Sequence, residues 1–315
     1  MRTARIEGIN KDWSVITLGC WQIAPSGGWG DLCSPQDADA TVKAGLEAGI
    51  TAFDTAEGYG DGESERRLSK ALGNKKDDVI IISKIWPDAE LSIEGYQERL
   101  EGTLRALNRD YVDLYLVHWP GPYFNTKEKT QKLCELMFKL QDSGKTKTIG
   151  LSNFQAGDLS LMGQEASKFS VNQIPYSLLE REYEGASLEA CKKAGNGYMA
   201  YSPTARGLLA GKFAKEDMGP SCRKNYEVYQ EPLFSHSKKV YTEITSIAQE
   251  FGTEPINIAL AWVLAQDNLF TAIAGSRKPH QVPEFAKAGD LLLTDETLAR
   301  LKDLSDSFHK VKAGE

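Results

Sequence analysis

The sequence predicts an α/β protein in which eight parallel strands close into a barrel. Short β-rich runs alternate with segments of helical periodicity, at spacings of about 30 residues, and this pattern calls for parallel pairing through right-handed crossovers. The runs number eight, and none is followed by the GxGxxG turn that an open dinucleotide-binding sheet carries in its first unit. Because no linker rich in Pro, Gly or Ser interrupts the pattern, we expect residues 1–315 to form a single domain.

Each predicted strand is a short run rich in β-branched, aromatic and other apolar residues. In chain order the strands are VITLG (15–19), ITAFD (50–54), VIIISK (79–84), YVDLYLVH (111–118), TKTIGLSN (146–153), FSVNQI (169–174), GYMAYS (197–202) and LFTAIAG (269–275).

Helices are expected between the strands, and the first has a clear beginning and end. Residues 34–49 place Ser34 at the N-cap and Pro35 in the first turn, and Gly49 ends the helix. Later helices are predicted where apolar residues recur at helical spacing, over 93–107, 127–144 and 297–308.

Composition and charge exclude several classes of protein. A hydrophobic content of 41% suffices for a full core, and a net charge of −7 without a basic stripe offers nucleic acid no surface. No apolar run reaches the ~18 to 20 residues that span a bilayer, and the first residues lack the apolar centre of a secretory signal. We therefore expect a cytoplasmic protein without a membrane partner. The cysteines are Cys20, Cys33, Cys134, Cys191 and Cys222. Their odd number and the lack of a CxxC pair favour reduced structural thiols over disulfides or a metal site.

Ionisable or hydrogen-bonding side chains close most of the predicted strands. A single lysine there usually snorkels to the surface, but a buried Lys84 needs an anion, and Asp54 on the neighbouring strand supplies one. The C-terminal strand ends of a parallel barrel converge on the face that holds the active site. We therefore expect one shared pocket for Asp54, Lys84, His118, Ser152, Asn153, Gln173, Tyr201 and Ser202.

These residues stand in motifs that resemble the aldo-keto reductase family. FDTAEGYG, ISK, VHWP, IGLSNF, YSPTARGLLAGK and GSRKPHQVPE occur in the family's order over nearly the whole chain. They are most similar to those of the bacterial NADPH-dependent members of its eleventh group. The resemblance implies a (β/α)8 TIM barrel that binds NADPH, or with less preference NADH, without a Rossmann motif. It also implies a catalytic tetrad at Asp54, Tyr59, Lys84 and His118.

Carbonyl reduction gives each member of this tetrad a role. The reaction needs a hydride donor and an acid that protonates the developing alkoxide, and a cation that stabilises the phenolate makes Tyr59 a usable acid. Lys84 is that cation, and Asp54 holds its ammonium group in place. His118 orients the substrate oxygen.

The resemblance further implies the residues that bind the cofactor. Those expected to hold the nicotinamide are Ser152, Asn153 and Gln173 at the carboxamide and Tyr201 against the ring. Those expected near the pyrophosphate and the adenosine are Ser202, Leu208, Gly211, Lys212 and Arg223.

The GSRKPHQVPE motif is expected at the adenosine end. Ser276 and Arg277 would hold the 2′-phosphate, for which an arginine offers a bidentate contact, and Gly275 beside them is also expected to bind the cofactor. The adenine contacts are expected from Gln281 and Glu284. One departure is Phe285, which stands where the family usually has asparagine.

The substrate is expected to be a small aldehyde or an aldose in an open site, because only residues 309–315 follow the last predicted helix. The aromatic residues expected at the barrel mouth are Trp21, Trp29, Trp86, Trp119, Tyr123 and Phe124. The sequence does not indicate the oligomeric state.

Two other functions remain open at the level of sequence. One is a cofactor-binding regulatory subunit, such as the beta subunits of voltage-gated potassium channels, which a turnover assay would distinguish. The other is an aldolase that forms a Schiff base through Lys84, which borohydride would trap in the presence of a carbonyl substrate.

Overall fold

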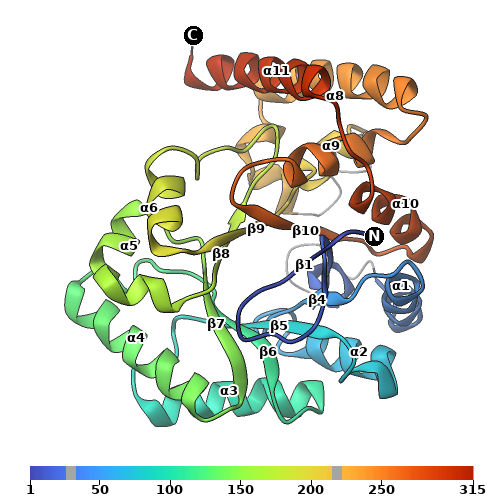
Figure 1. Ribbon diagram of the computed structural model, residues 1–315. Helices are drawn as coiled ribbons and strands as arrows, with labels where there is room; N and C mark the ends of the chain where they lie inside the picture. Colours follow the sequence, from blue (N-terminus) through green and yellow to red (C-terminus); the bar gives the residue numbers. More distant parts are fainter. Residues whose placement is uncertain (26–32, 215–221, 315) are drawn as a thin grey trace.

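The computed structural model describes residues 1–25, 33–214 and 222–314, and within them the predicted TIM barrel is confirmed. The eight barrel strands pair in parallel, in the closed order β10-β3-β4-β5-β6-β7-β8-β9 (Figure 1). All eight predicted runs form strands: β3 (Ile16–Gly19), β4 (Ala52–Asp54), β5 (Ile80–Ile85), β6 (Val112–Val117), β7 (Thr146–Ser152), β8 (Val171–Pro175), β9 (Gly197–Tyr201) and β10 (Leu269–Gly275).

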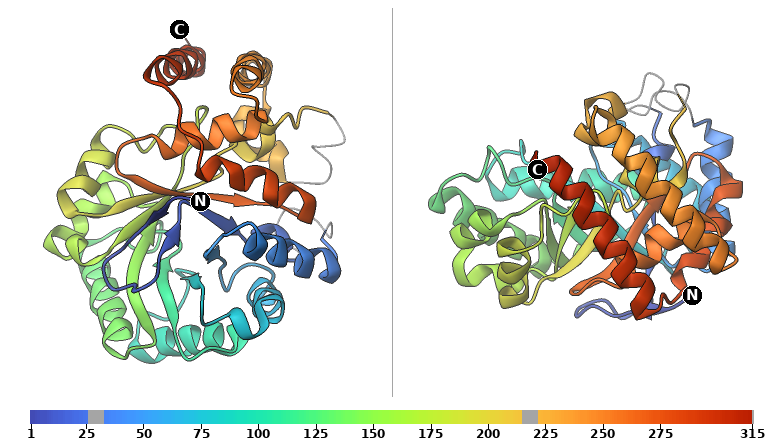
Figure 2. Two further views of the ribbon diagram at one scale, coloured as in Figure 1. Left: turned by 45° about the vertical axis from the view of Figure 1, so that its right-hand side comes forward. Right: turned by 90° about the horizontal axis from the view of Figure 1, so that it is seen from above.

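Helices surround the barrel, as Figure 2 shows from two further directions. They are α1 (Pro35–Glu47), α2 (Glu63–Leu72), α3 (Ile93–Leu107), α4 (Lys127–Asp142), α5 (Ala156–Met162), α6 (Ala186–Ala194), α8 (Leu233–Glu250), α9 (Pro255–Leu264), α10 (Val282–Ala286) and α11 (Asp295–Ala313). None of the described helices is long and apolar enough to cross a membrane.

The predicted beginning of α1 is present in detail. The Ser34 side chain accepts a hydrogen bond from the backbone N–H of Asp37, and Pro35 occupies the first turn.

The expected end of the last helix was wrong. Residues 309–313 continue α11 and do not form a tail, because Lys310 and Lys312 suit the negative end of the helix dipole and Gly314 supplies the left-handed C-terminal cap.

An N-terminal hairpin closes the barrel at the end opposite the strand C-termini. Strands β1 (Thr3–Ala4) and β2 (Trp13–Ser14) pair antiparallel and lie across the barrel opening (Figures 1 and 2). Trp13 is fully buried, packs edge-on against Phe270 with a centroid distance of 5.3 Å, and donates from its indole N–H to Thr17. Ile9 and Trp13 thereby join the apolar side chains inside the barrel.

Candidate active site

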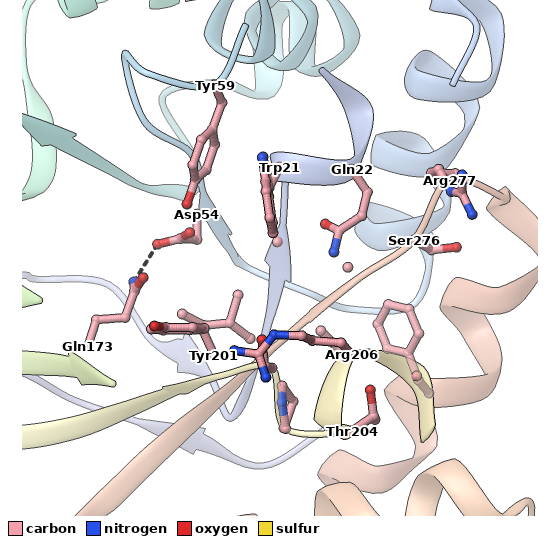
Figure 3. A pocket seen from close by; sticks show the side chains of 18 of the residues that line it. Trp21, Gln22, Asp54, Tyr59, Gln173, Tyr201, Thr204, Arg206, Ser276 and Arg277 are labelled. Atoms are coloured by element: carbon pink, nitrogen blue, oxygen red, sulfur yellow. Dashed lines mark hydrogen bonds between the residues drawn. The ribbon is translucent and has the colours of Figure 1, made fainter. Parts of the chain in front are cut away.

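The C-terminal ends of the barrel strands open into one cleft with a volume of about 1310 Å³. Figure 3 shows part of its lining, with Asp54 and Tyr59 at one end and Ser276 and Arg277 at the other. The predicted convergence of polar strand ends therefore occurs. Lys84 is fully buried beneath the cleft surface and does not line it.

The buried ammonium group of Lys84 has three acceptors. Its Nζ lies 2.7 Å from Asp54 Oδ1, 2.8 Å from the Thr55 carbonyl oxygen and 3.2 Å from the Tyr59 hydroxyl oxygen. An ammonium group has three N–H donors, and all of them are used here. Because the Tyr59 oxygen accepts one of these bonds, its own hydroxyl proton can be donated elsewhere.

Burial and charge act in opposite directions on the two titratable neighbours. Burial by itself would lower the pKa of Lys84, but its interactions with the Asp54 carboxylate and the Tyr59 oxygen outweigh this effect, and the pKa lies above its ordinary value. Burial raises the pKa of Tyr59, and the nearby Lys84 opposes that rise only in part. At neutral pH the site therefore holds a charged lysine beside a protonated phenol.

His118 follows β6 and lies between two aromatic rings. Its ring centroid is 5.0 Å from that of Trp86 and 5.7 Å from that of Tyr59, both in edge-on geometry. Burial, with a further contribution from Lys84, holds the pKa of His118 well below its ordinary value. The imidazole is therefore neutral at neutral pH, and its buried Nδ1 has no hydrogen-bond partner among the described residues.

The four residues predicted to face the nicotinamide lie on one side of the cleft and form a chain of hydrogen bonds. Asn153, which has a left-handed φ of 65°, donates to the Ser152 hydroxyl oxygen and to the His118 carbonyl oxygen, both at 3.0 Å. Tyr201 donates to Asn153 Oδ1 at 2.8 Å. Gln173 Nε2 donates to Asp54 Oδ2 at 2.6 Å, so this amide also holds the carboxylate that pairs with Lys84 (Figure 3).

At the other end of the cleft the lining includes eight of the residues predicted to bind the rest of the cofactor. The Ser276 hydroxyl donates to the Gln281 side chain at 2.6 Å, and Glu284 accepts from Asn257 at 3.0 Å. The eight are Ser202, Lys212, Arg223, Gly275, Ser276, Arg277, Gln281 and Glu284. Leu208 and Gly211 lie outside the lining, since Leu208 is fully buried and Gly211 packs against Tyr241.

Several lining residues were not identified from the sequence. Arg206 forms an ion pair with Glu180 and lies over the Tyr226 ring at 3.6 Å. Its backbone has a left-handed φ of 57°, a conformation that the sequence does not indicate at a non-glycine residue. The other residues missed include Gln22, Thr204, Gly207 and Glu254.

The predicted aromatic residues of the mouth fall into three groups. Trp21, Trp86 and Trp119 line the cleft. Tyr123 and Phe124 do not line it, and Trp29 lies outside the described residues. In the described ranges no group of three or more His, Cys, Asp or Glu side chains is arranged to hold a metal ion.

Comparison with known proteins gives consistent matches. The model of the Aldo/keto reductase family matches residues 15–306. Aldo-keto reductase YhdN from Bacillus subtilis is 33% identical over 90% of this chain and 87% of its own length. The structure of the glycerol dehydrogenase AKR11B4 from Gluconobacter oxydans superimposes with a TM-score of 0.82 at 28% identity, covering 96% of this chain and 94% of that one. An aldo/keto reductase from Klebsiella pneumoniae, solved with NADP and acetate, superimposes with a TM-score of 0.77 at 29% identity, covering 96% and 95%.

Proposed function

The chain belongs to the aldo-keto reductase family and is an NAD(P)-dependent carbonyl oxidoreductase, and on this premise we propose that it reduces small aldehydes and aldoses with NADPH, using Tyr59 as the proton donor. The observation that carries the proposal is the buried Lys84 ammonium group, which is hydrogen-bonded to both Asp54 and Tyr59. Such a cation stabilises the phenolate that remains after Tyr59 has donated its proton.

Each residue of this cluster has a distinct role. Asp54 keeps Lys84 charged and fixed, and Gln173 keeps the carboxylate in position from across the barrel. His118 is neutral and buried at the same end of the cleft, so its imidazole can donate to the carbonyl oxygen and orient it. As the carbonyl oxygen gains negative charge it takes the proton of Tyr59, and the product is an alcohol.

The far end of the cleft suits the phosphates of a dinucleotide. Cationic side chains gather there on the loop after β9 and on the segment after β10: Lys212, Arg223, Arg277 and Lys278. Charge-assisted contacts of this kind are the ones that bind phosphate. We assign Ser276 and Arg277 to the 2′-phosphate and the Ser152, Asn153, Gln173 and Tyr201 group to the nicotinamide. When bound, the cofactor supplies the hydride.

The cofactor proposal is consistent with one structural neighbour, the Klebsiella pneumoniae protein, which was solved with NADP.

The environment of Lys84 disfavours a Schiff-base mechanism. Lys84 is fully buried, does not line the cleft, and has a pKa above its ordinary value, whereas a nucleophilic lysine must be neutral and reach the substrate.

The experiment is a panel of aldehydes, ketones and aldoses, assayed in both directions through the absorbance of NADPH. We expect NADPH oxidation with small aldehydes or aldoses, and slower turnover with NADH. A protein that binds NADPH without turning over any member of the panel would instead be a regulatory subunit. Borohydride treatment in the presence of substrate serves as a control and should leave Lys84 unmodified.

A further inference from the structure

The reaction end of the cleft, where Tyr59 lies, has a charge distribution that the proposed mechanism does not use. Among the described lining residues on the segments that follow β3 to β8, Arg99 on α3 is the one with a cationic side chain. The other cations of the described lining lie on the segments after β9 and β10. The carboxylates that line the reaction end without a catalytic role are those of Glu57, Asp61 and Asp88.

Two of these carboxylates occupy the guanidinium group of Arg99. Its Nε and Nη2 donate to the two carboxylate oxygens of Glu57 at 2.9 and 2.6 Å, and its Nη1 donates to Asp88 Oδ1 at 3.0 Å. Glu57 is held in turn by the backbone N–H of Trp86, which donates to its Oε1 at 2.6 Å. A guanidinium group in a bidentate pair with one carboxylate and bonded to a second has little capacity left for an anionic ligand. Two carboxylates against one cation leave this cluster negative.

Asp61 adds a further negative charge to the same end. Its side chain is exposed and lines the cleft. Arg66 donates to the backbone carbonyl oxygen of Asp61 but pairs with the carboxylate of Glu63. Within the ranges that the structure describes, the carboxylate of Asp61 forms no ion pair. The reaction end is therefore acidic.

These charges lie where the remainder of a bound substrate extends. Glu57 stands two residues before Tyr59, and Trp86, whose backbone holds Glu57, contacts the His118 ring with a centroid distance of 5.0 Å. The nicotinamide is assigned to the ends of β7, β8 and β9, and β4 and β5 lie across the barrel from β8 and β9. With its carbonyl group at Tyr59 and His118, a substrate therefore has its remaining atoms toward the segments after β4 and β5, which carry Glu57 and Asp88.

A carboxylate on that part of a substrate would meet like charges and an arginine that is already paired, whereas ammonium and hydroxyl groups can donate to carboxylate oxygens. We propose that the reaction end selects carbonyl compounds whose remaining part is neutral or cationic and rejects those that carry a carboxylate, and that Asp61 and Asp88 set this preference. This inference rests on the proposed NADPH-dependent function and narrows its substrate class.

The test compares three para-substituted benzaldehydes of different charge: 4-carboxybenzaldehyde, 4-formylbenzamide and 4-formyl-N,N,N-trimethylanilinium. Their intrinsic reactivities do not depend on the protein, so a change between variants in the ratio of two kcat/KM values reports the site. Asp88→Asn should raise the ratio of the carboxylate to the amide about 5-fold and lower the ratio of the cation to the amide by about the same factor. The change should lie in KM rather than kcat, because the charge acts on binding, and it should shrink at high salt.

Asp61→Asn provides an independent second arm. Asparagine accepts the left-handed φ of 52° at this position, so the substitution removes the charge without straining the backbone. It should move both ratios in the same directions as Asp88→Asn. Unchanged ratios in either variant would overturn the proposal, and so would shifts that persist at high salt.

Two further variants serve as controls. Asp88→Glu keeps the charge and should keep the wild-type ratios. Asp78→Asn, at an exposed carboxylate that pairs with Lys75 and does not line the cleft, should keep them as well. A shift of the same size in Asp78→Asn would assign the effect to the net charge of the protein and contradict the proposal. A wild-type protein that reduces none of the three aldehydes would instead contradict the proposed function, on which this inference depends.

Discussion

At the scale of single residues, the site depends on a buried ammonium group whose three donors are all used. Asp54 supplies the charge, and Thr55 and Tyr59 supply the remaining acceptors. Removing one partner of a buried ion pair leaves an uncompensated charge, which is far more costly than replacing both partners. The stability and the chemistry of the site therefore depend on the same contacts.

Lys84→Met should lower the free energy of unfolding by about 3 to 5 kcal/mol, because it leaves the Asp54 carboxylate buried without its cation. It should also reduce single-turnover hydride transfer, because the phenolate of Tyr59 loses its stabilising charge. Urea denaturation and stopped-flow absorbance measure the two effects. The matched control is Lys84→Met combined with Asp54→Asn, which should recover stability without recovering the rate. Recovery of both would remove Lys84 from the chemistry.

Residues whose position at a strand end identifies them could be predicted from the sequence. Asp54, Lys84 and His118 each follow an apolar run, and the barrel brings them together. The bond from Gln173 to Asp54 was not predictable, because the two residues are 119 positions apart and lie on β8 and β4, which are not neighbours in the barrel. Gln22 was missed because it stands in a short helix after β3 without any periodic pattern.

At the scale of elements, most of the barrel could be predicted because each strand and its following helix carry their own pattern. The N-cap at Ser34 and the eight strands follow from local composition. The hairpin of β1 and β2 could not be predicted, because its strands have only 2 residues each, too few to show alternation. It forms because Trp13 fills the open end of the barrel, which is a tertiary effect.

The contact of α2 with β5 predicts a pH dependence of stability. Glu65 on α2 is buried and accepts a hydrogen bond from Ser83 on β5, and burial raises its pKa from an ordinary value of 4.5 to about 7. At a pH between these two pKa values the carboxyl group of Glu65 is ionised in the unfolded chain but keeps its proton in the folded protein. The contribution of protonated Glu65 to the free energy of unfolding is therefore complete below pH 4.5, falls as the pH rises and is lost above pH 7.

Glu65→Gln removes this titration. The change in the free energy of unfolding that it causes, relative to wild type, should be more favourable at pH 8 than at pH 4.5 by up to about 3 kcal/mol. Urea denaturation of both proteins at the two pH values measures the difference. Glu101→Gln, at a partly exposed residue whose ion pair with Lys145 lowers its pKa, should show no such gain at pH 8. An identical pH profile for wild type and Glu65→Gln would mean that Glu65 stays ionised in the folded protein.

At the scale of the whole molecule, charge is distributed unevenly although the net charge is −7. The end of the cleft that holds Ser276 and Arg277 collects cations from the loop after β9 and the segment after β10, two parts of the chain that follow neighbouring strands of the barrel. Under the proposed function, this gathering of cations orients an anionic cofactor along the cleft. It depends on the tertiary fold and is not visible as a run of basic residues in the sequence.

Arg277→Ala should narrow the difference in binding free energy between NADPH and NADH by about 1 to 3 kcal/mol, because a charged hydrogen bond to the 2′-phosphate is lost. Fluorescence titration of both cofactors into both proteins measures this. Arg300→Ala, at an exposed arginine of α11 that pairs with Glu250, is the control and should leave both affinities unchanged. An unaltered preference in Arg277→Ala would place the phosphate contact on Arg223 or Lys212.

Single-turnover hydride transfer in Tyr59→Phe tests the claim that Tyr59 donates the proton in an NADPH-dependent reduction. The substitution removes one oxygen and leaves the ring's packing, so NADPH affinity should hardly change while the rate on an accepted aldehyde falls by ~10² to 10⁴-fold. Tyr123→Phe, outside the cleft lining, should keep the wild-type rate. A Tyr59→Phe protein that transfers hydride at nearly the wild-type rate would contradict the claim and leave His118 as the acid.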